Sequence, residues 1–190
     1  MRLVYFLSGM PGTGKSTFIA KNGIEALTLS LDTLRHIYSG LQTDFLGNMV
    51  LSQDKNDLVY AKFIEALKIR LQLGGIIFID NLNPSFNDIS EIIPIIQSYD
   101  YDYRVVEFPL ESIDFYFERN KNRPTYKSIP ESRLITLHEV FSKREFPADK
   151  TMTVEEVEKY INATPEDLMI DVSHYDKIHF IGDLQGSYYP

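Results

Sequence analysis

A glycine-rich stretch near the N-terminus, GMPGTGKS at residues 9–16, limits the folds open to this chain more than any other feature. It matches G-x-x-x-x-G-K-[ST], the pattern of a phosphate-binding loop between a buried strand and a helix. The context agrees, because residues 3–7 are apolar and β-prone and residues 16–21 lack Pro and Gly. We therefore expect a nucleotide-binding loop here, rather than a glycine turn before an ordinary helix.

Each position of this loop has a chemical reason. Glycines let backbone N–H groups converge on an anion at a helix N-terminus. Lys15 brings a positive charge to the β and γ phosphates, and the Ser16 hydroxyl can ligate Mg²⁺. We expect ATP or another nucleoside triphosphate, with Mg²⁺, to bind here. The expected contact residues are Gly9, Gly12, Gly14, Lys15, Ser16 and Thr17.

Composition excludes several alternatives. A chain of 190 residues suits one α/β domain with a small appendage. Without cysteine it forms no disulfide, thiolate metal site or Cys nucleophile. No apolar run approaches the roughly 20 residues of a membrane span, and no signal peptide precedes the first strand. We expect a cytoplasmic protein with no membrane partner, and leave open whether it forms a homo-oligomer.

Strand-like and helix-like segments alternate along the chain. The pattern predicts strands at 3–7, 26–31, 76–79 and 103–108, and helices at 33–38, 57–73, 86–98, 110–120 and 130–143. Residues 39–54 look like a polar loop. Such alternation predicts a three-layer α/β sandwich with a central parallel sheet, as in P-loop NTPases of the adenylate-kinase type. Ligands of such sheets bind beyond the carboxyl ends of the strands.

Polar residues follow the second and third expected strands. Asp32 can accept a proton from an attacking hydroxyl, or serve only as a helix N-cap, and Arg35 one turn later can hold a phosphate. Asp80 can meet Mg²⁺ through water or contact a ligand hydroxyl, and Asn81 and Asn83 offer amides to a substrate. An ordinary turn at the strand end is the alternative for this second cluster.

Basic residues gather later in the chain. The net charge of −8 argues against a nucleic-acid partner, yet residues 118–145 hold seven basic and four acidic residues, a local net charge of +3. Within it, Arg119 and Arg123 lie four apart and would share a helix face. They suit a lid that closes on the γ-phosphate, although two solvated arginines remain an alternative.

The ordered set of motifs resembles the polynucleotide 5′-hydroxyl kinases, including the kinase domain of bacterial polynucleotide kinase-phosphatases. The matching pieces are GxxxxGKST, D-x-x-R at 32–35, DNLNP at 80–84 and R-x-x-x-R at 119–123. The resemblance implies a kinase domain at 1–148 with a lid near 119–130. Transfer would run from ATP to the 5′-OH end of RNA or DNA, in nucleic-acid end healing or repair.

The resemblance also implies residue roles. Asp32 would be the general base, and Arg35 would bind a phosphate of the acceptor. Lys15 and Arg119 would act in catalysis, with Arg119 and Arg123 on the donor. Asp80, Asn81 and Asn83 would bind substrate. Two other functions stay open: a kinase of a small metabolite or nucleoside, and an ATP-binding module without phosphoryl transfer.

The C-terminal residues resemble the start of a second domain. An apolar run at 178–181 precedes GDLQG, which is similar to the opening G-D-x-H-G of binuclear metallophosphoesterases with Gln185 in place of the histidine. An Asp and an amide are too few ligands for a two-metal site. We expect a linker at 149–176, an incompetent phosphatase start at 177–190, and a downstream phosphatase domain in a longer natural chain.

Overall fold

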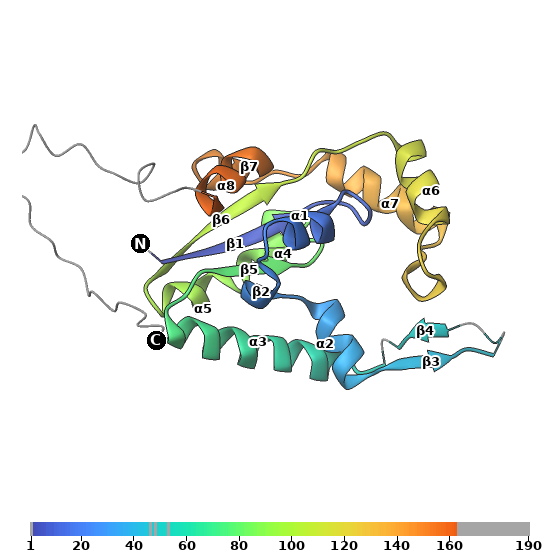
Figure 1. Ribbon diagram of the computed structural model, residues 1–190, viewed down its shortest axis with the longest axis horizontal. Coiled ribbons are helices and arrows are strands. Elements are labelled where there is room, and N and C mark those ends of the chain that lie inside the picture. The colour runs from blue at the N-terminus through green and yellow to red at the C-terminus, as the bar shows by residue number, and fades with distance from the viewer. Residues whose placement is uncertain (1, 46, 48, 53, 163–190) are drawn as a thin grey trace, which may run out of the picture.

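A computed structural model describes residues 2–45, 47, 49–52 and 54–162 of the chain. A five-stranded sheet with helices on both faces forms its centre (Figure 1). Among the described residues, no helix combines the length and the apolar character needed to cross a membrane. The resemblance to a metallophosphoesterase start at 177–190 lies outside the described residues.

All five strands of the central sheet run parallel, in the order β2-β5-β1-β6-β7. Their bounds are β1 Arg2–Ser8, β2 Thr28–Leu29, β5 Ile77–Asp80, β6 Tyr101–Glu107 and β7 Thr151–Thr153. The register pairs Val4 of β1 with Ile77 of β5 and Tyr103 of β6. The carboxyl ends of β1 and β5 therefore meet at one edge, which confirms the predicted α/β architecture.

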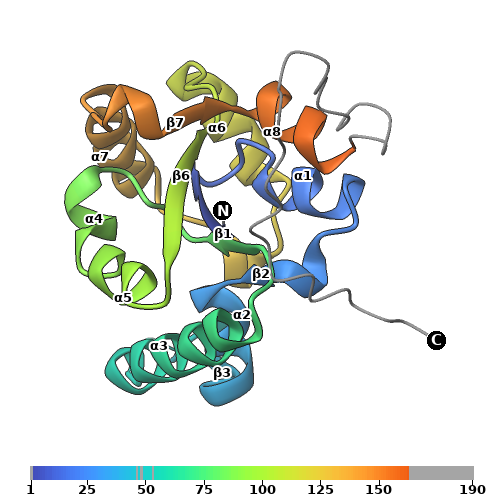
Figure 2. The same cartoon turned by 90° about the vertical axis from the view of Figure 1, so that its left-hand side faces the viewer.

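Helices cover both faces of this sheet (Figure 2). Those with the most residues are α3 Asn56–Leu73, α7 Glu131–Ser142, α6 Ile113–Lys121, α2 Leu31–Tyr38 and α8 Val154–Ile161. Shorter ones are α1 Lys15–Lys21, α4 Phe86–Ser90 and α5 Ile93–Gln97, and three 3₁₀ turns are η1 Glu25–Leu27, η2 Thr125–Lys127 and η3 Ala148–Lys150. A small antiparallel hairpin, β3 Leu41–Thr43 and β4 Met49–Leu51, projects after α2.

Alternate side chains of β1 enter two separate cores. Val4 and Phe6 are fully buried in the cluster with Phe63 and Leu67 of α3. Tyr5 and Leu7 enter the opposite cluster, with residues of α1 and with Val157 of α8. This alternation is what a parallel strand covered on both faces requires.

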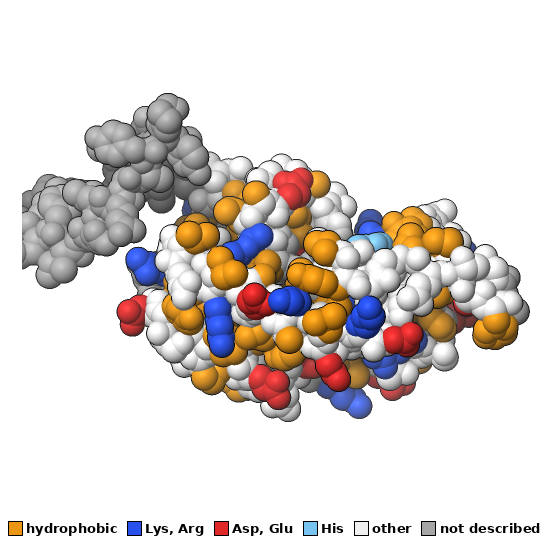
Figure 3. All heavy atoms as spheres, turned by 90° about the horizontal axis from the view of Figure 1, so that it is seen from below, with side chains coloured by type: hydrophobic (Ala, Val, Ile, Leu, Met, Phe, Trp, Pro, Cys, Tyr) orange, Lys and Arg blue, Asp and Glu red, His pale blue; other side chains and the backbone are white. Residues whose placement is uncertain are grey.

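Helix α3 covers one face of the sheet and keeps an outer face of its own. Its outer surface, seen from below in Figure 3, mixes apolar side chains with charged ones. Leu58, Ile69 and Leu73 are exposed there, while Phe63 and Leu67 point into the core. The helix ends at Gly74, whose φ of 84° is the left-handed conformation that glycine adopts most readily.

Three expected elements differ from the structure. The helix predicted at 86–98 is two short helices, because Pro94 lacks an N–H and occupies the first turn of α5. The second strand is only Thr28–Leu29, since η1 takes up residues 25–27 and α2 begins at Leu31. The segment predicted as a polar loop, 39–54, contains the β3-β4 hairpin.

The boundary predicted after residue 148 also moves. Residues 151–153 pair with β6 as the fifth strand, and the side chain of Val157 on α8 is fully buried. A capping box at Thr153, with Glu156 at the reciprocal position, starts this helix. The α/β unit therefore extends through residue 161, and the described part of the predicted linker belongs to this unit, with Val157 in its core.

Candidate active site

The loop between β1 and α1 has the backbone of an anion cradle. Gly12 and Gly14 adopt φ values of 94° and 108°, which favour glycine over other residues. A Cβ atom at Gly9 would lie 2.9 Å from Cβ of Phe108 and 2.9 Å from Oγ1 of Thr13, so a larger residue does not fit. Three of the predicted contact residues must therefore be glycine, Gly12 and Gly14 for their backbone conformation and Gly9 for lack of space.

Lys15 lies over this loop at the start of α1. Its ammonium group donates hydrogen bonds to the carbonyl oxygens of Gly9 and Met10, the second at 3.2 Å. Ser16 and Thr17 follow in the first turn of α1 with exposed side chains. A lysine held by the loop's own carbonyls, with hydroxyls beside it, fits a bound triphosphate and its Mg²⁺.

Two carboxylates lie close to this lysine. Burial lowers the pKa of Lys15 to about 8, against the opposing charge of Asp80 and, more weakly, of Asp32. Burial also raises the pKa of Asp80. The positive charge of Lys15 opposes this rise, and the negative charge of Asp32 adds to it. Residues from the ends of β1 and β5 and the start of α2 are therefore near enough to affect one another's charge. The structure brings together what the sequence placed in three separate motifs.

Asp32 and Arg35 form an ion pair on α2. Nη1 of Arg35 lies 2.6 Å from Oδ1 of Asp32, and Nε of Arg35 donates to Oδ1 of Asn56 at 3.1 Å. The Asp32 side chain is 76% exposed, whereas that of Arg35 is 23% exposed. The structure shows no side-chain cap bond at the start of α2, where Ser30 is the N-cap. Asp32 is therefore open to a ligand and not used as an N-cap.

The two asparagines after β5 differ in their surroundings. Asn83 is buried with a φ of 44°, and its amide donates to the carbonyl oxygens of Leu7 and Ile79 at 3.0 and 3.3 Å. Oδ1 of Asn81 accepts from the backbone N–H of Leu31 at 3.0 Å. Asn83 thus ties β1 to β5, and Asn81 ties β5 to the start of α2. Both amides position the backbone around Asp80 and Asp32.

Arg119 and Arg123 do not share a helix face. The helix α6 ends at Lys121, so Arg123 lies beyond it. Nη1 of Arg119 donates to the carbonyl oxygen of Gly12 at 2.9 Å, and its guanidinium lies 4.6 Å from the ring centroid of Phe115. Burial lowers the pKa of Arg123, which the nearby Asp32 carboxylate opposes. Arg119 therefore contacts the loop, and Arg123 lies within electrostatic reach of both Asp32 and Lys15.

The basic segment 118–145 is divided among several surroundings. Nε of Arg144 lies 3.1 Å from Oε1 of Glu107, and Lys121 pairs with Glu118. Lys127 is close enough to Asp80 to lower its pKa. The positive charge predicted from the sequence is therefore divided, with Arg123 within electrostatic reach of Asp32 and Lys127 within reach of Asp80.

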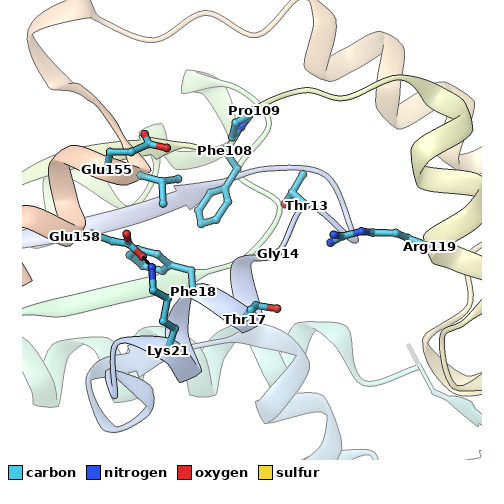
Figure 4. A pocket seen from close by; sticks show the side chains of 11 residues that line it. Thr13, Gly14, Thr17, Phe18, Lys21, Phe108, Pro109, Arg119, Glu155 and Glu158 are labelled. Atoms are coloured by element: carbon cyan, nitrogen blue, oxygen red, sulfur yellow. Dashed lines mark hydrogen bonds and ion pairs between the residues drawn. The ribbon is translucent and has the colours of Figure 1, made fainter.

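A pocket of about 340 Å³ lies beside the loop (Figure 4). Thr13, Gly14 and Thr17 border it on the loop side, and Arg119 borders it from α6. Phe18 and Phe108 pack edge to face in its wall, with ring centroids 5.6 Å apart. The pocket is continuous with the candidate phosphate cradle and has aromatic walls.

Helix α8 forms one wall of this pocket. The sequence did not predict this role of the helix. Val154, Glu155 and Glu158 line the pocket, and Glu158 pairs with Lys21 of α1 at 2.8 Å. These residues lie within the predicted linker and match no motif. The only sequence signal was the helical pattern of residues 154–161, which does not show what that helix packs against.

Sequence searches give no relative: no protein-family profile and no curated protein matches the chain. Solved structures resemble it in fold. A candidate kinase from Chloroflexus aurantiacus matches with a TM-score of 0.60 and 15% identity, over 84% of this chain and 96% of that chain. A chain of the Pnkp1/Rnl/Hen1 complex matches with a TM-score of 0.50 and 20% identity, over 68% of this chain and 45% of that one. The chain therefore has the α/β fold of P-loop kinases, with a central parallel sheet of five strands flanked by helices.

Proposed function

We propose that this protein is an ATP-dependent kinase that transfers the γ-phosphate to the 5′-hydroxyl end of an RNA or DNA strand. The observation that carries the proposal is the position of Asp32. Its exposed carboxylate lies within electrostatic reach of Lys15 in the loop and pairs with Arg35 on the outer side. A carboxylate between a phosphate cradle and a cation suits a hydroxyl acceptor that itself carries phosphate.

The chemistry follows from this arrangement. Asp32 takes the proton of the 5′-hydroxyl while the hydroxyl oxygen bonds to the γ-phosphorus. The bond from that phosphorus to the β-γ bridging oxygen breaks, which releases ADP. Lys15 and the loop N–H groups balance the negative charge on the phosphates. Bound Mg²⁺, held through the Ser16 hydroxyl, would supply further charge neutralisation. Arg35 and Arg123 would hold phosphates on the acceptor side.

The pocket beside the loop suits the donor nucleoside. Its wall includes the largely buried Phe18 and Phe108, which add apolar contact, and the guanidinium of Arg119 offers a flat surface to a base ring. The pocket lies next to Thr13 and Thr17, so a nucleotide with its nucleoside in the pocket can place its phosphates on the cradle. Donor and acceptor would then approach the γ-phosphate from opposite sides, as in-line transfer requires.

A labelled-phosphate assay tests the proposal. The protein is incubated with γ-labelled ATP, Mg²⁺ and matched RNA and DNA oligonucleotides that carry either a 5′-OH or a 5′-phosphate. We expect label on the 5′-OH strands alone. Lys15→Ala is the catalytic control, because it removes the charge that the triphosphate needs.

Other outcomes point to other functions. Faster transfer to a nucleoside or sugar than to any oligonucleotide would indicate a small-metabolite kinase. ATP binding with no transfer to any hydroxyl would indicate a binding module. Either outcome would overturn the polynucleotide assignment.

A further inference from the structure

A second aromatic site lies one helical turn from Asp32. Residues four apart on a helix share a face, and the rise over four residues is about 6 Å. His36 is therefore next to Asp32 on the surface of α2. Its ring packs edge to face against Tyr126 of η2, with centroids 5.5 Å apart. An aromatic pair thus lies beside the turn of α2 that carries the carboxylate that would activate the 5′-OH.

The position of Tyr126 is fixed by its own loop. The Asn120 side chain donates to the carbonyl oxygen of Ile129 at 2.7 Å and accepts from its N–H at 3.0 Å, which closes the loop of 120–129. Strand β4 of the hairpin lies against η2, and Figure 1 shows the hairpin and this loop at the same end of the molecule. The ring is therefore preorganised, which lowers the entropic cost of stacking a ligand on it.

The surroundings of Tyr126 favour a nucleobase with phosphates beside it. Nζ of Lys127 lies 5.8 Å from the centroid of the Tyr126 ring, and Arg123 lies near Asp32. Strands β3 and β4 carry no charged residue and include the apolar Leu41, Met49 and Val50 beside the polar Gln42 and Thr43. Aromatic rings flanked by cations are the usual means of binding single-stranded nucleic acid.

We propose that Tyr126, backed by His36, stacks on the base of the 5′-terminal nucleotide of the acceptor strand. This inference rests on the proposed function and adds the part of the acceptor that is recognised. The 5′-OH then reaches Asp32, and Lys127 lies where the following backbone can pass. The half-buried Tyr126 ring contacts the acceptor directly, while the hairpin acts only by holding η2.

An abasic acceptor gives the test. The wild-type protein receives 5′-OH oligonucleotides that differ only in whether the 5′-terminal residue has a base. We expect kcat/KM to be about 5- to 150-fold higher with the base, the range that one stacked base contributes. Tyr126→Phe keeps the ring and should keep this preference. Tyr126→Ala should abolish the preference and leave the KM for ATP unchanged.

Each remaining outcome decides a separate point. Equal use of both acceptors by the wild-type protein would overturn the stacking role while leaving the kinase assignment intact. If Tyr126→Ala lowered kcat/KM equally for both acceptors, the ring would serve only to hold the loop against α2. That result would also overturn the stacking role. Transfer to neither acceptor would instead refute the proposed function. Tyr160→Ala, at an exposed tyrosine of α8, controls for removal of a ring elsewhere.

Discussion

Nη1 of Arg35 lies 2.6 Å from Oδ1 of Asp32, so a carboxylate within electrostatic reach of Lys15 is already oriented by a cation on its own helix. Arg35 is in turn held by Asn56, through a bond of 3.1 Å from Nε. Among the described residues, Asp32 and Asn56 are the side-chain partners of Arg35, and its other guanidinium donors can hold a ligand. Under the proposed function, Arg35 both orients Asp32, the general base, and holds a phosphate of the acceptor.

Asp32→Asn should separate chemistry from donor binding. The amide cannot take the proton, so the rate of phosphoryl transfer should fall by about 10²- to 10⁴-fold. Affinity for a non-hydrolysable ATP analogue should stay near that of the wild type. The matched control is Asp114→Asn, an exposed acid also in the first turn of a helix, which should keep the rate. Weakened ATP binding with intact turnover would show that Asp32 is not the base.

Donor affinity should depend on pH through Lys15. Burial lowers the pKa of this lysine to about 8 in the free protein, from 10.5, and the phosphates bind its cationic form. As pH rises from 7 to 9, the free lysine loses its proton, and affinity for the ATP analogue should fall by about tenfold. Calorimetric titration across this range measures the change.

Lys15→Arg is the control for that experiment, since arginine stays cationic throughout. Its affinity, whatever its level, should be flat between pH 7 and 9. If the affinity of the wild-type protein for the ATP analogue did not change between pH 7 and 9, Lys15 would still be protonated at pH 9.

Oligonucleotide binding should weaken moderately with salt. Each phosphate contact to a single strand contributes about −0.7 to the slope of log K against log salt concentration. Besides Lys15, which would bind the donor, Arg35, Arg123 and Lys127 lie near one or other of the two carboxylates, so a slope of about −1 to −2 is expected if two or three of them contact phosphates. Lys127→Ala should make it less steep, whereas Lys143→Ala should leave it unchanged. A slope near zero would favour a small, neutral acceptor.

The stability of the protein should depend on α8. Val157→Ala removes two methyl groups from a fully buried position, and the free energy of unfolding should fall by about 1–3 kcal/mol. Tyr160→Ala, on the same helix with a side chain 63% exposed, should have little effect. Urea denaturation measures both. Equal, negligible effects would mean that this helix is a linker and not part of the core.

The sequence predicted the centre of the fold because its signals there are local. The loop at residues 9–16 fixes β1, α1 and the turn between them, and the apolar run of β5 between Gly75 and Asp80 marks a strand covered on both faces. The expectation that Asp32 and Asp80 lie near Lys15 follows from parallel strands ending at one edge. Local sequence and a simple topological rule were enough for this part.

The sequence failed where position depends on tertiary contacts. The hairpin has strands of three residues, too short for an alternating pattern to stand out beside Gly40 and Gly47. The helix expected at 86–98 satisfied the apolar spacing, yet Pro94 divided it. The place of α8 in the pocket wall involves contacts between distant segments, such as the pairing of Lys21 with Glu158, 137 residues apart, which no local pattern encodes.

That distant pairing has a consequence for how the protein is made. A chain emerging from the ribosome exposes the loop of residues 9–16 first, but the wall formed by Glu155 and Glu158 is among the last described parts to be synthesised. A ligand stabilises only the form that binds it. Under the proposed function, the complete ATP site can therefore form only after translation has passed residue 158. Until then the nascent chain must avoid aggregation and proteolysis without its nucleotide.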